Sequence, residues 1–168
     1  MPPKSQRLWL TTDQQVTEID APAEHVYDLV ADLPRMGEWS NECGRVEWTK
    51  GASHAAPDAT FLGHNYTGPR GIIKWSRKGR VLTADRGREF AFATEEGGRE
   101  GVVWRYRFEP RGDYTLVTES YEVRRIPTWA RILDVPTNRH GALLKSMRHT
   151  LERLKAAAES ATIPGATQ

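Results

Sequence analysis

The chain has 168 residues, of which 38% are hydrophobic, and its 24 basic and 22 acidic side chains leave a formal net charge of only +2. This length suits one domain with a real core, and the near balance of charge favours no nucleic-acid partner. The single cysteine, Cys43, excludes an internal disulfide framework, and no apolar run reaches the roughly 18 residues of a membrane span. Because the N-terminus also lacks the apolar core of a signal peptide, we expect a cytoplasmic protein without stable membrane insertion.

The pattern predicts one domain over residues 13–160, preceded by a loose N-terminal arm (1–12) and followed by a small, polar and disordered tail (161–168). The domain begins with a strand at 14–20. Pro22 then suits a first helical turn, and apolar residues follow at helical spacing: Val26, Leu29, Val30 and Leu33. Pro34 ends that helix and opens a second short helix that reaches Trp39.

Six further strands are predicted, at 43–50, 59–67, 72–84, 89–94, 101–109 and 115–123. The strand at 101–109 alternates most clearly, with aromatic and aliphatic residues on one face and arginines on the other. Val117, Glu119 and Tyr121 continue the apolar face on the last strand. Such alternation is typical of an antiparallel sheet with one buried face and one face in water.

The longest helical pattern in the chain covers residues 137–159. Its apolar face consists of Leu143, Leu144, Met147, Leu151, Leu154 and Ala158, which recur at spacings of three and four. Thr137 is a suitable N-cap, and a short helix through Trp129, Ile132 and Leu133 is expected just before it. We predict that the long helix lies across the sheet, with Leu143, Met147 and Leu154 facing a cavity between the two.

The stretch VTEIDAPAEHVYDLVADLPRMGEWS, at 16–40, resembles the opening of the polyketide cyclase/dehydrase and lipid-transport family, within the START-like and Bet v 1-like superfamily. The matching pieces are Ala21-Pro22, the helix at 26–30, Asp32 and Trp39. FLGHN at 61–65, EFAF at 89–92 and the closing LLKSMRHTLERLKAAAE extend the resemblance over about residues 14–159.

This resemblance implies an α+β helix-grip fold. It has a seven-stranded curved antiparallel sheet, two short helices between strands 1 and 2, and a long C-terminal helix over a cavity. Members of the family bind or transport hydrophobic molecules such as lipids, sterols or polyketides, and some cyclise polyketides. The resemblance implies a hydrophobic small-molecule ligand and no bound cofactor. The resemblance does not identify the ligand, and it does not decide between a monomer and a homodimer.

The inward strand faces and the long helix supply the candidate ligand-binding residues. These are Phe61, Asn65, Trp75, Phe90, Phe92, Trp104, Tyr106, Val117, Tyr121, Leu143 and Met147. Aromatic side chains offer large flat apolar surfaces, and a few polar tips then orient a ligand. The alternative is that the same side chains form an ordinary packed core.

Arg77, Glu119 and Tyr121 are the candidate catalytic residues, because they are polar and fall on faces predicted to point inward. A buried charge is costly unless it is paired, so Arg77 and Glu119 are expected to pair with each other or to hold a polar group of the ligand. The alternative is that these positions reach water at strand ends, or that a one-residue register error turns them outward.

No other chemical signature is present in the sequence. The five histidines lack metal-ligand spacing, Cys43 has no histidine near it in sequence, and no nucleophile or phosphate-binding motif occurs. We therefore expect no metal site. Three functions remain: a carrier of a hydrophobic molecule, a cyclase in which Arg77 stabilises an enolate while Glu119 or Tyr121 moves protons, and an interaction module. An interaction module should have a collapsed cavity and an exposed apolar patch.

Overall fold

A computed structural model of the chain describes residues 12–67, 69–134 and 136–162. The predicted N-terminal arm and disordered tail lie almost entirely outside these residues. The elements in chain order are β1 (Thr12–Ile19), α1 (Ala23–Ala31), η2 (Leu33–Glu38), β2 (Cys43–Thr49), β3 (Thr60–Thr67), η3 (Pro69–Gly71), β4 (Ile73–Asp85), β5 (Glu89–Glu96), β6 (Arg99–Arg111), β7 (Tyr114–Val123), α2 (Thr128–Asp134) and α3 (Arg139–Thr162).

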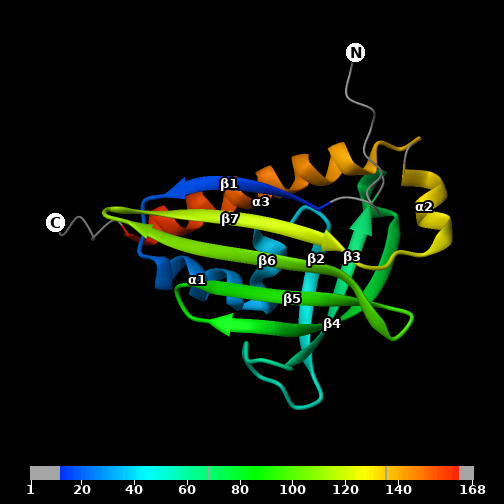
Figure 1. Cartoon of the computed structure of the whole chain (residues 1–168), viewed down its shortest axis with the longest axis horizontal. Coiled ribbons are helices and arrows are strands. Elements are labelled where there is room, and N and C mark those ends of the chain that lie inside the picture. Colours follow the sequence, from blue (N-terminus) through cyan, green and yellow to red (C-terminus); the bar gives the residue numbers. More distant parts are fainter. Residues whose placement is uncertain (1–11, 68, 135, 163–168) are drawn as a thin grey trace.

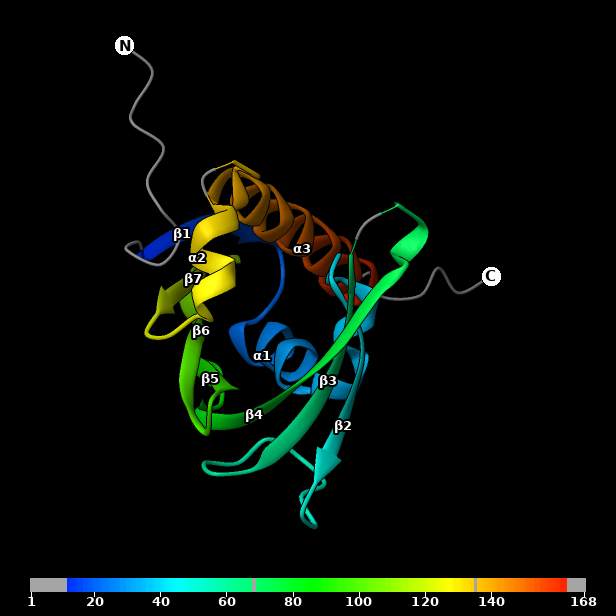
Figure 2. The same cartoon turned by 90° about the vertical axis from the view of Figure 1, so that its right-hand side faces the viewer.

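The seven strands form one antiparallel sheet in the order β1-β7-β6-β5-β4-β3-β2. Strands β1 and β2 follow each other in sequence yet lie at opposite edges, so α1 and η2 carry the chain across the concave side. Helix α3 lies over the same side, and the sheet curls around both helices (Figures 1 and 2). The predicted helix-grip fold is therefore confirmed.

Irregular pairing lets the sheet bend. The register shifts between Cys43 and Arg45, between Val81 and Thr83, and between Ala93 and Glu95. Each shift adds an unpaired residue to one strand, which increases the local twist and turns the strand direction. The curvature leaves depth between the sheet and α3.

The core fills one end of this space. Tyr27 of α1 meets Phe90 and Phe108 edge-on, with ring centroids 6.1 Å and 5.8 Å apart. The second half of α3 packs into the same cluster through Leu151, Leu154 and Ala158, all of them buried. Leu154 therefore belongs to the packed core, and its predicted place at the cavity is wrong, because α1 occupies the space that it faces.

The start of the long helix also differs from the prediction. The Thr137 hydroxyl donates a hydrogen bond to the carbonyl oxygen of Leu133, 2.6 Å away, and so satisfies the last turn of α2. Helix α3 begins two residues later, after Asn138 in a left-handed conformation with φ of 46°. Thr137 does not cap α3, because its side chain serves the preceding helix.

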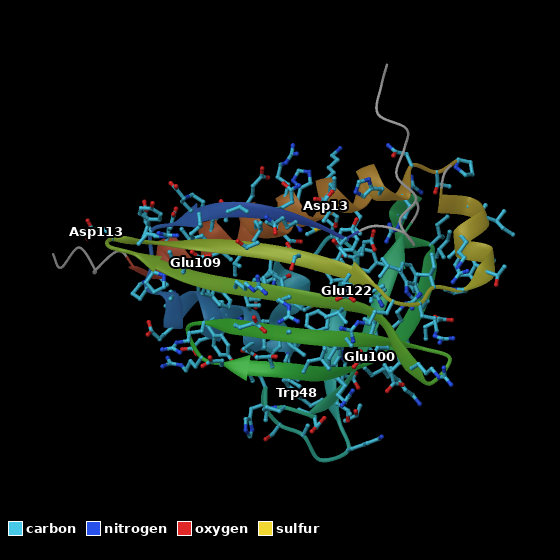
Figure 3. All side chains as sticks on the ribbon, in the orientation of Figure 1. Asp13, Trp48, Glu100, Glu109, Asp113 and Glu122 are labelled. Atoms are coloured by element: carbon cyan, nitrogen blue, oxygen red, sulfur yellow. The ribbon has the colours of Figure 1, made fainter. Side chains whose placement is uncertain are left out.

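The outward face of the sheet is covered by charged side chains (Figure 3). Arg124 pairs with Glu122, at 3.1 Å, and with Glu100, while Arg111 pairs with Glu109 at 2.8 Å. This face is wet, as the alternation in β6 and β7 predicts. A binding cavity must therefore lie on the concave side.

Gly37 of η2 fixes the distance between η2 and β2, and its substitution is a test of this packing. A Cβ atom at Gly37 would lie 2.3 Å from the carbonyl oxygen of Gly44, closer than real contacts allow. We expect Gly37→Ala to lower the free energy of unfolding by about 1–3 kcal/mol, measured by urea denaturation.

Gly63→Ala is the matched control, since a Cβ atom there would meet its nearest neighbour at 3.7 Å, an ordinary contact. If both variants are equally stable, the close approach of η2 to β2 does not constrain the fold.

Candidate ligand-binding cavity

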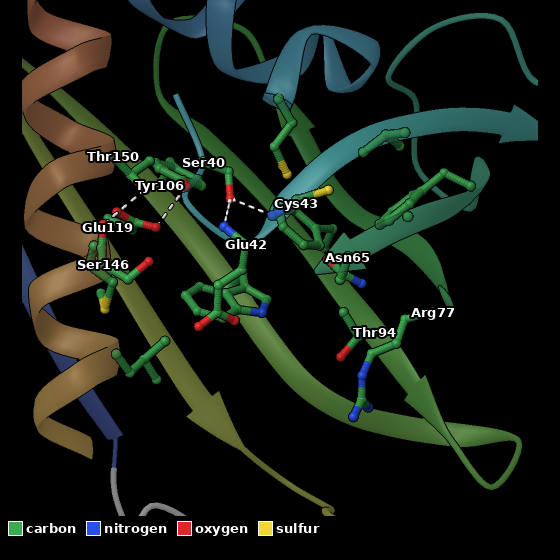
Figure 4. A pocket seen from close by; sticks show the side chains of 18 residues that line it. Ser40, Glu42, Cys43, Asn65, Arg77, Thr94, Tyr106, Glu119, Ser146 and Thr150 are labelled. Carbon is green, nitrogen blue, oxygen red and sulfur yellow. Dashed lines mark hydrogen bonds between the residues drawn. The ribbon is translucent and has the colours of Figure 1, made fainter. Parts of the chain in front are cut away.

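A void of about 120 Å³ lies between the sheet and the first half of α3 (Figure 4). It is lined by Met36, Ser40, Glu42, Cys43, Val46, Phe61, Gly63, Asn65, Arg77, Phe92, Thr94, Trp104, Tyr106, Glu119, Leu143, Ser146, Met147 and Thr150. The walls are mostly apolar. Small-molecule sites usually enclose about 300–1,000 Å³, so the side chains leave less free space than a drug-sized ligand needs.

Most of the predicted site residues line this void. They are Phe61, Asn65, Arg77, Phe92, Trp104, Tyr106, Glu119, Leu143 and Met147. Period-2 alternation brings the strand residues to the concave face, and helical spacing brings Leu143 and Met147 over them. Phe61 and Phe92 meet edge-on with centroids 5.5 Å apart, and Gly79, directly opposite Phe61 in the register, leaves room for its ring.

Trp75 does not line the void, contrary to the prediction. It lines a second, more open hollow together with His64, Tyr66, Arg70 and other residues of the β3–β4 region. The cause is its position near the start of β4, where the hairpin extends past the covered part of the sheet. Asn65, its partner across the β3–β4 ladder, borders both spaces.

Phe90, Val117 and Tyr121 also fall outside the lining, although all three are buried. Phe90 and Val117 belong to the core cluster that α1 closes. Tyr121 packs with Leu143 and Met147 in a separate small cluster, with its ring 5.9 Å from that of Trp104. These side chains support the lining residues, and the core alternative holds for them.

Glu119 is the most unusual group in the cavity, because it is only 3% exposed and has one hydrogen bond among the described residues. Tyr106 lies directly opposite on β6 and donates its hydroxyl to Oε1 of Glu119 at 2.7 Å. Within the described chain, Oε2 is buried and has no partner. A buried polar atom without a partner is rare and calls for an explanation.

Burial raises the pKa of Glu119 to about 8, and the hydrogen bond from Tyr106 lowers it only in part. The same burial, together with the neighbouring carboxyl, raises the pKa of Tyr106 well above its ordinary value. At neutral pH the carboxyl is therefore mainly protonated, since a charge would be poorly solvated here. Burial also raises the pKa of the Cys43 thiol to about 11, which leaves it a protonated, unreactive wall residue.

The ion pair between Arg77 and Glu119 that the sequence suggests does not form. Nη1 of Arg77 lies 3.1 Å from Oε2 of Glu96, and both side chains are about a quarter exposed. Arg77 therefore sits where the lining reaches solvent, close enough to a surface carboxylate to pair there. Glu119 remains without a cation because its position is deeper.

A second ion pair stands at the same rim. Both terminal nitrogens of Arg139, at the start of α3, donate to the carboxylate of Glu42, at 2.6 Å and 2.8 Å. Ser40 supports the Glu42 loop, because its hydroxyl accepts hydrogen bonds from the backbone nitrogens of Glu42 and Cys43. This pair ties the loop before β2 to the long helix.

Sequence reasoning missed several lining residues, and the clearest are on α3. Ser146 and Thr150 lie at positions that continue the helical spacing of Leu143 and Met147. They are small and polar, so an apolar-face search passes over them. The Thr150 hydroxyl donates to the carbonyl of Ser146 at 3.1 Å, whereas no partner of the Ser146 hydroxyl is found within the described chain.

Apolar side chains are exposed at the end of the molecule that faces the viewer in Figure 2. Ile72 and Ile73 stand at the β3–β4 connection, and Trp129, Ile132 and Leu133 on α2. In Figure 2, α2 lies beside the start of α3, and the β3–β4 connection lies on the opposite side of this end of the molecule. The two ion pairs, Arg77–Glu96 and Arg139–Glu42, make the rim of the cavity polar, whereas these exposed side chains make its surroundings apolar.

Neither a metal cluster nor a membrane helix is found in the part of the chain that the structure describes. No group of three or more histidine, cysteine or carboxylate side chains is placed to hold a metal ion there. None of the described helices is long and apolar enough to cross a membrane.

A family model described as polyketide cyclase/dehydrase and lipid transport matches residues 12–159. No protein in a search of curated proteins matches the chain. Among solved structures, the Polyketide_cyc-like protein Cgl2372 from Corynebacterium glutamicum is 26% identical, with a TM-score of 0.61 and full coverage of both chains.

Two more distant structures share the fold. TTHA0849 from Thermus thermophilus is 19% identical, with a TM-score of 0.64, and the match covers 90% of this chain and 99% of that one. The di-domain ARO/CYC StfQ, from the steffimycin biosynthetic pathway, is 13% identical with a TM-score of 0.70. That match covers 89% of this chain and 51% of StfQ, so the chain corresponds to about half of it.

The raised pKa of Glu119 predicts a loss of stability with rising pH. The folded carboxyl holds its proton up to about pH 8, whereas an exposed carboxyl releases it near 4.5. The folded state therefore binds more protons between these values, and the free energy of unfolding falls as pH rises through this window. At about 1.4 kcal/mol per pH unit, the total loss is on the order of 5 kcal/mol.

We expect Glu119→Gln to remove most of this slope, because the amide is uncharged and similar in shape. Glu122→Gln is the matched control: it lies on the outward face of the same strand and should keep the slope. The measurement is urea denaturation from pH 5 to 9. Equal slopes in the wild type and Glu119→Gln would mean that Glu119 titrates normally.

Proposed function

Because this chain belongs to the polyketide cyclase/dehydrase and lipid transport family, we propose that its cavity binds a hydrophobic small molecule such as a lipid, a polyketide or a sterol-like compound. The observation that carries the proposal is the void itself, which has mainly apolar walls and one buried acid. Apolar walls with a few convergent polar groups are the usual composition of a small-molecule site. Binding of this kind needs no reaction machinery.

The ligand must enlarge the void unless it is very small, and the walls favour such a change. Met36 and Met147 are unbranched and adapt their shape at low cost. Leu143 and the Glu42–Arg139 pair border the end at which the lining reaches solvent. Movement of the first turn of α3, away from the packed half of that helix, would open the cavity without disturbing the core.

An interaction module is a less suitable proposal, although two groups of exposed apolar side chains are present. They are Ile72 and Ile73 at the β3–β4 connection, and Trp129, Ile132 and Leu133 on α2. Exposed apolar side chains at this end of the molecule also suit a carrier that takes up apolar molecules. A buried acid without a partner lowers stability, and a module with no ligand would gain nothing from such an acid under α3.

The second candidate function is a cyclase, and the specific observation in its favour is Glu119. A carboxyl with a pKa of about 8 can both donate and accept a proton near neutral pH. It lies in a mainly apolar cavity that would hold a substrate. Arg77, in its pair with Glu96, is less available for an enolate than the sequence suggests.

Filling the void tests the binding proposal. We expect Leu143→Trp to weaken binding of N-phenyl-1-naphthylamine, a neutral apolar fluorescent probe, by at least tenfold, because the indole would occupy the space beside Met147. Lys145→Trp is the control, since this residue is on the exposed side of the same helix. Thermal unfolding of each variant confirms that it is folded.

Native mass spectrometry of the wild type with lipid and polyketide extracts then identifies retained compounds. Absence of both probe binding and retained compounds would contradict the proposed function.

The carrier and the cyclase differ in their response to Glu119→Gln. If the protein is a carrier, the variant keeps its ligand and the wild type returns the ligand chemically unchanged. If it is a cyclase, poly-ketone substrates are converted by the wild type and the variant loses at least a hundredfold in rate with binding kept. Liquid chromatography with mass spectrometry distinguishes these outcomes.

A further inference from the structure

The free oxygen of Glu119 is the feature that the fold alone does not explain. Oε1 is occupied by the Tyr106 hydroxyl, whereas Oε2 is buried and has no partner within the described residues. Glu119 belongs to the lining, and in Figure 4 its carboxyl lies between Tyr106 and the α3 side of the void. A buried carboxyl with one oxygen held and the other free presents a single, fixed hydrogen-bonding position.

The groups around Glu119 decide which ligand chemistry fits this position. The other titratable or charged groups of the lining are Glu42, Cys43, Arg77 and Tyr106. Glu42 is paired with Arg139 and Arg77 with Glu96, so neither reaches Glu119 as a counter-charge.

Within the described residues, burial and the hydrogen bond from Tyr106 are the causes that shift the pKa of Glu119, and no charged neighbour is among them. Helix α3 contributes the hydroxyls of Ser146 and Thr150, and β1 places the neutral Gln15 opposite Glu119 in the register. Tyr121, on the same strand, is also uncharged. With no cation beside it, a buried carboxyl keeps its proton.

We infer that Glu119 is a specificity-determining residue that donates a hydrogen bond from Oε2 to an acceptor oxygen, such as a ketone carbonyl, of an uncharged hydrophobic ligand. This inference rests on the proposed function, because it names the chemistry of the molecule bound there. Tyr106 holds the carboxyl in place by donating to Oε1, so the proton is left on the side that faces the void. The Ser146 hydroxyl, which also faces the void in Figure 4, is a second polar contact.

The environment disfavours anionic ligands. A carboxylate brought beside Glu119 would lose its hydration without meeting an unpaired cation of the lining. An apolar ligand without an acceptor would offer Oε2 no hydrogen bond. Affinity should therefore depend on an uncharged acceptor and should fall as pH rises through about 8, where Glu119 loses its proton.

The test uses three compounds with the same bicyclic skeleton: 1-tetralone, tetralin and tetralin-1-carboxylate. Binding to the purified full chain is measured by NMR titration at pH 6.5 and pH 9.5. We expect the wild type to bind 1-tetralone at least tenfold more tightly than tetralin at pH 6.5, and the carboxylate most weakly. At pH 9.5 the preference for the ketone should fall towards one.

Two variants separate hydrogen bonding from shape. Glu119→Leu has no donor, so it should bind 1-tetralone and tetralin equally at both pH values. Glu119→Gln keeps a donor that does not titrate, so it should keep the preference for the ketone at pH 9.5. A purely structural role of Glu119 would not produce this contrast, and urea denaturation confirms that each variant folds.

Failure of the inference is distinguishable from failure of the proposed function. If the wild type binds the ketone and the hydrocarbon equally, or prefers the carboxylate, the role of Glu119 is overturned and the binding function stands. If none of the three compounds binds, and the extracts supply no ligand, the proposed function fails and the inference with it.

Discussion

Glu119 lies under α3, with one oxygen held by Tyr106 and the other turned to an apolar void. Removing this carboxyl from water is costly, and this cost constrains the side chains around it. The acid stays neutral because burial disfavours its charged form and no cation among the described residues pairs with it. An ordinary core would have an apolar residue at this position of β7. The cavity is therefore organised around one polar position in an apolar wall.

The second half of α3 packs in the core and its first half lines the void, because α1 lies only under the second half. Tyr27 brings α1 against the sheet, so Leu151 and Leu154 pack into a solid core at that end. Leu143 and Met147, one to three turns earlier, have no such neighbour and line the void. The rim is then held by Arg139 and Glu42, which join the start of the helix to the loop before β2. Stability and adaptable space are thus separated along one helix.

The positions of the strands and most of the inward-facing residues could be predicted from the sequence, because period-2 alternation decides which side chains share a face. The curved sheet and its cavity are predicted from the resemblance to the family. The pattern does not say where the cover over a sheet ends, so four residues that it groups with the lining lie outside it: Trp75, Phe90, Val117 and Tyr121. Pairing is also beyond a one-dimensional pattern. Glu96 is within reach of Arg77 because Gly79 pairs with Thr94 across β4 and β5, and the two charged residues lie two positions further along their antiparallel strands. Ser146 and Thr150 escape prediction because small polar residues do not stand out in an apolar stripe.

The small size of the void has a consequence for the kinetics of binding. If the cavity binds a ligand as proposed, a ligand larger than a few water molecules does not fit the void of about 120 Å³ and would need an enlarged form of the protein. The observed association rate would then level off at high ligand concentration, at the rate of opening. The apparent affinity would be reduced by the fraction of molecules that are open. Residence time, for the same reason, would depend on how often the rim opens rather than on contacts inside the cavity alone.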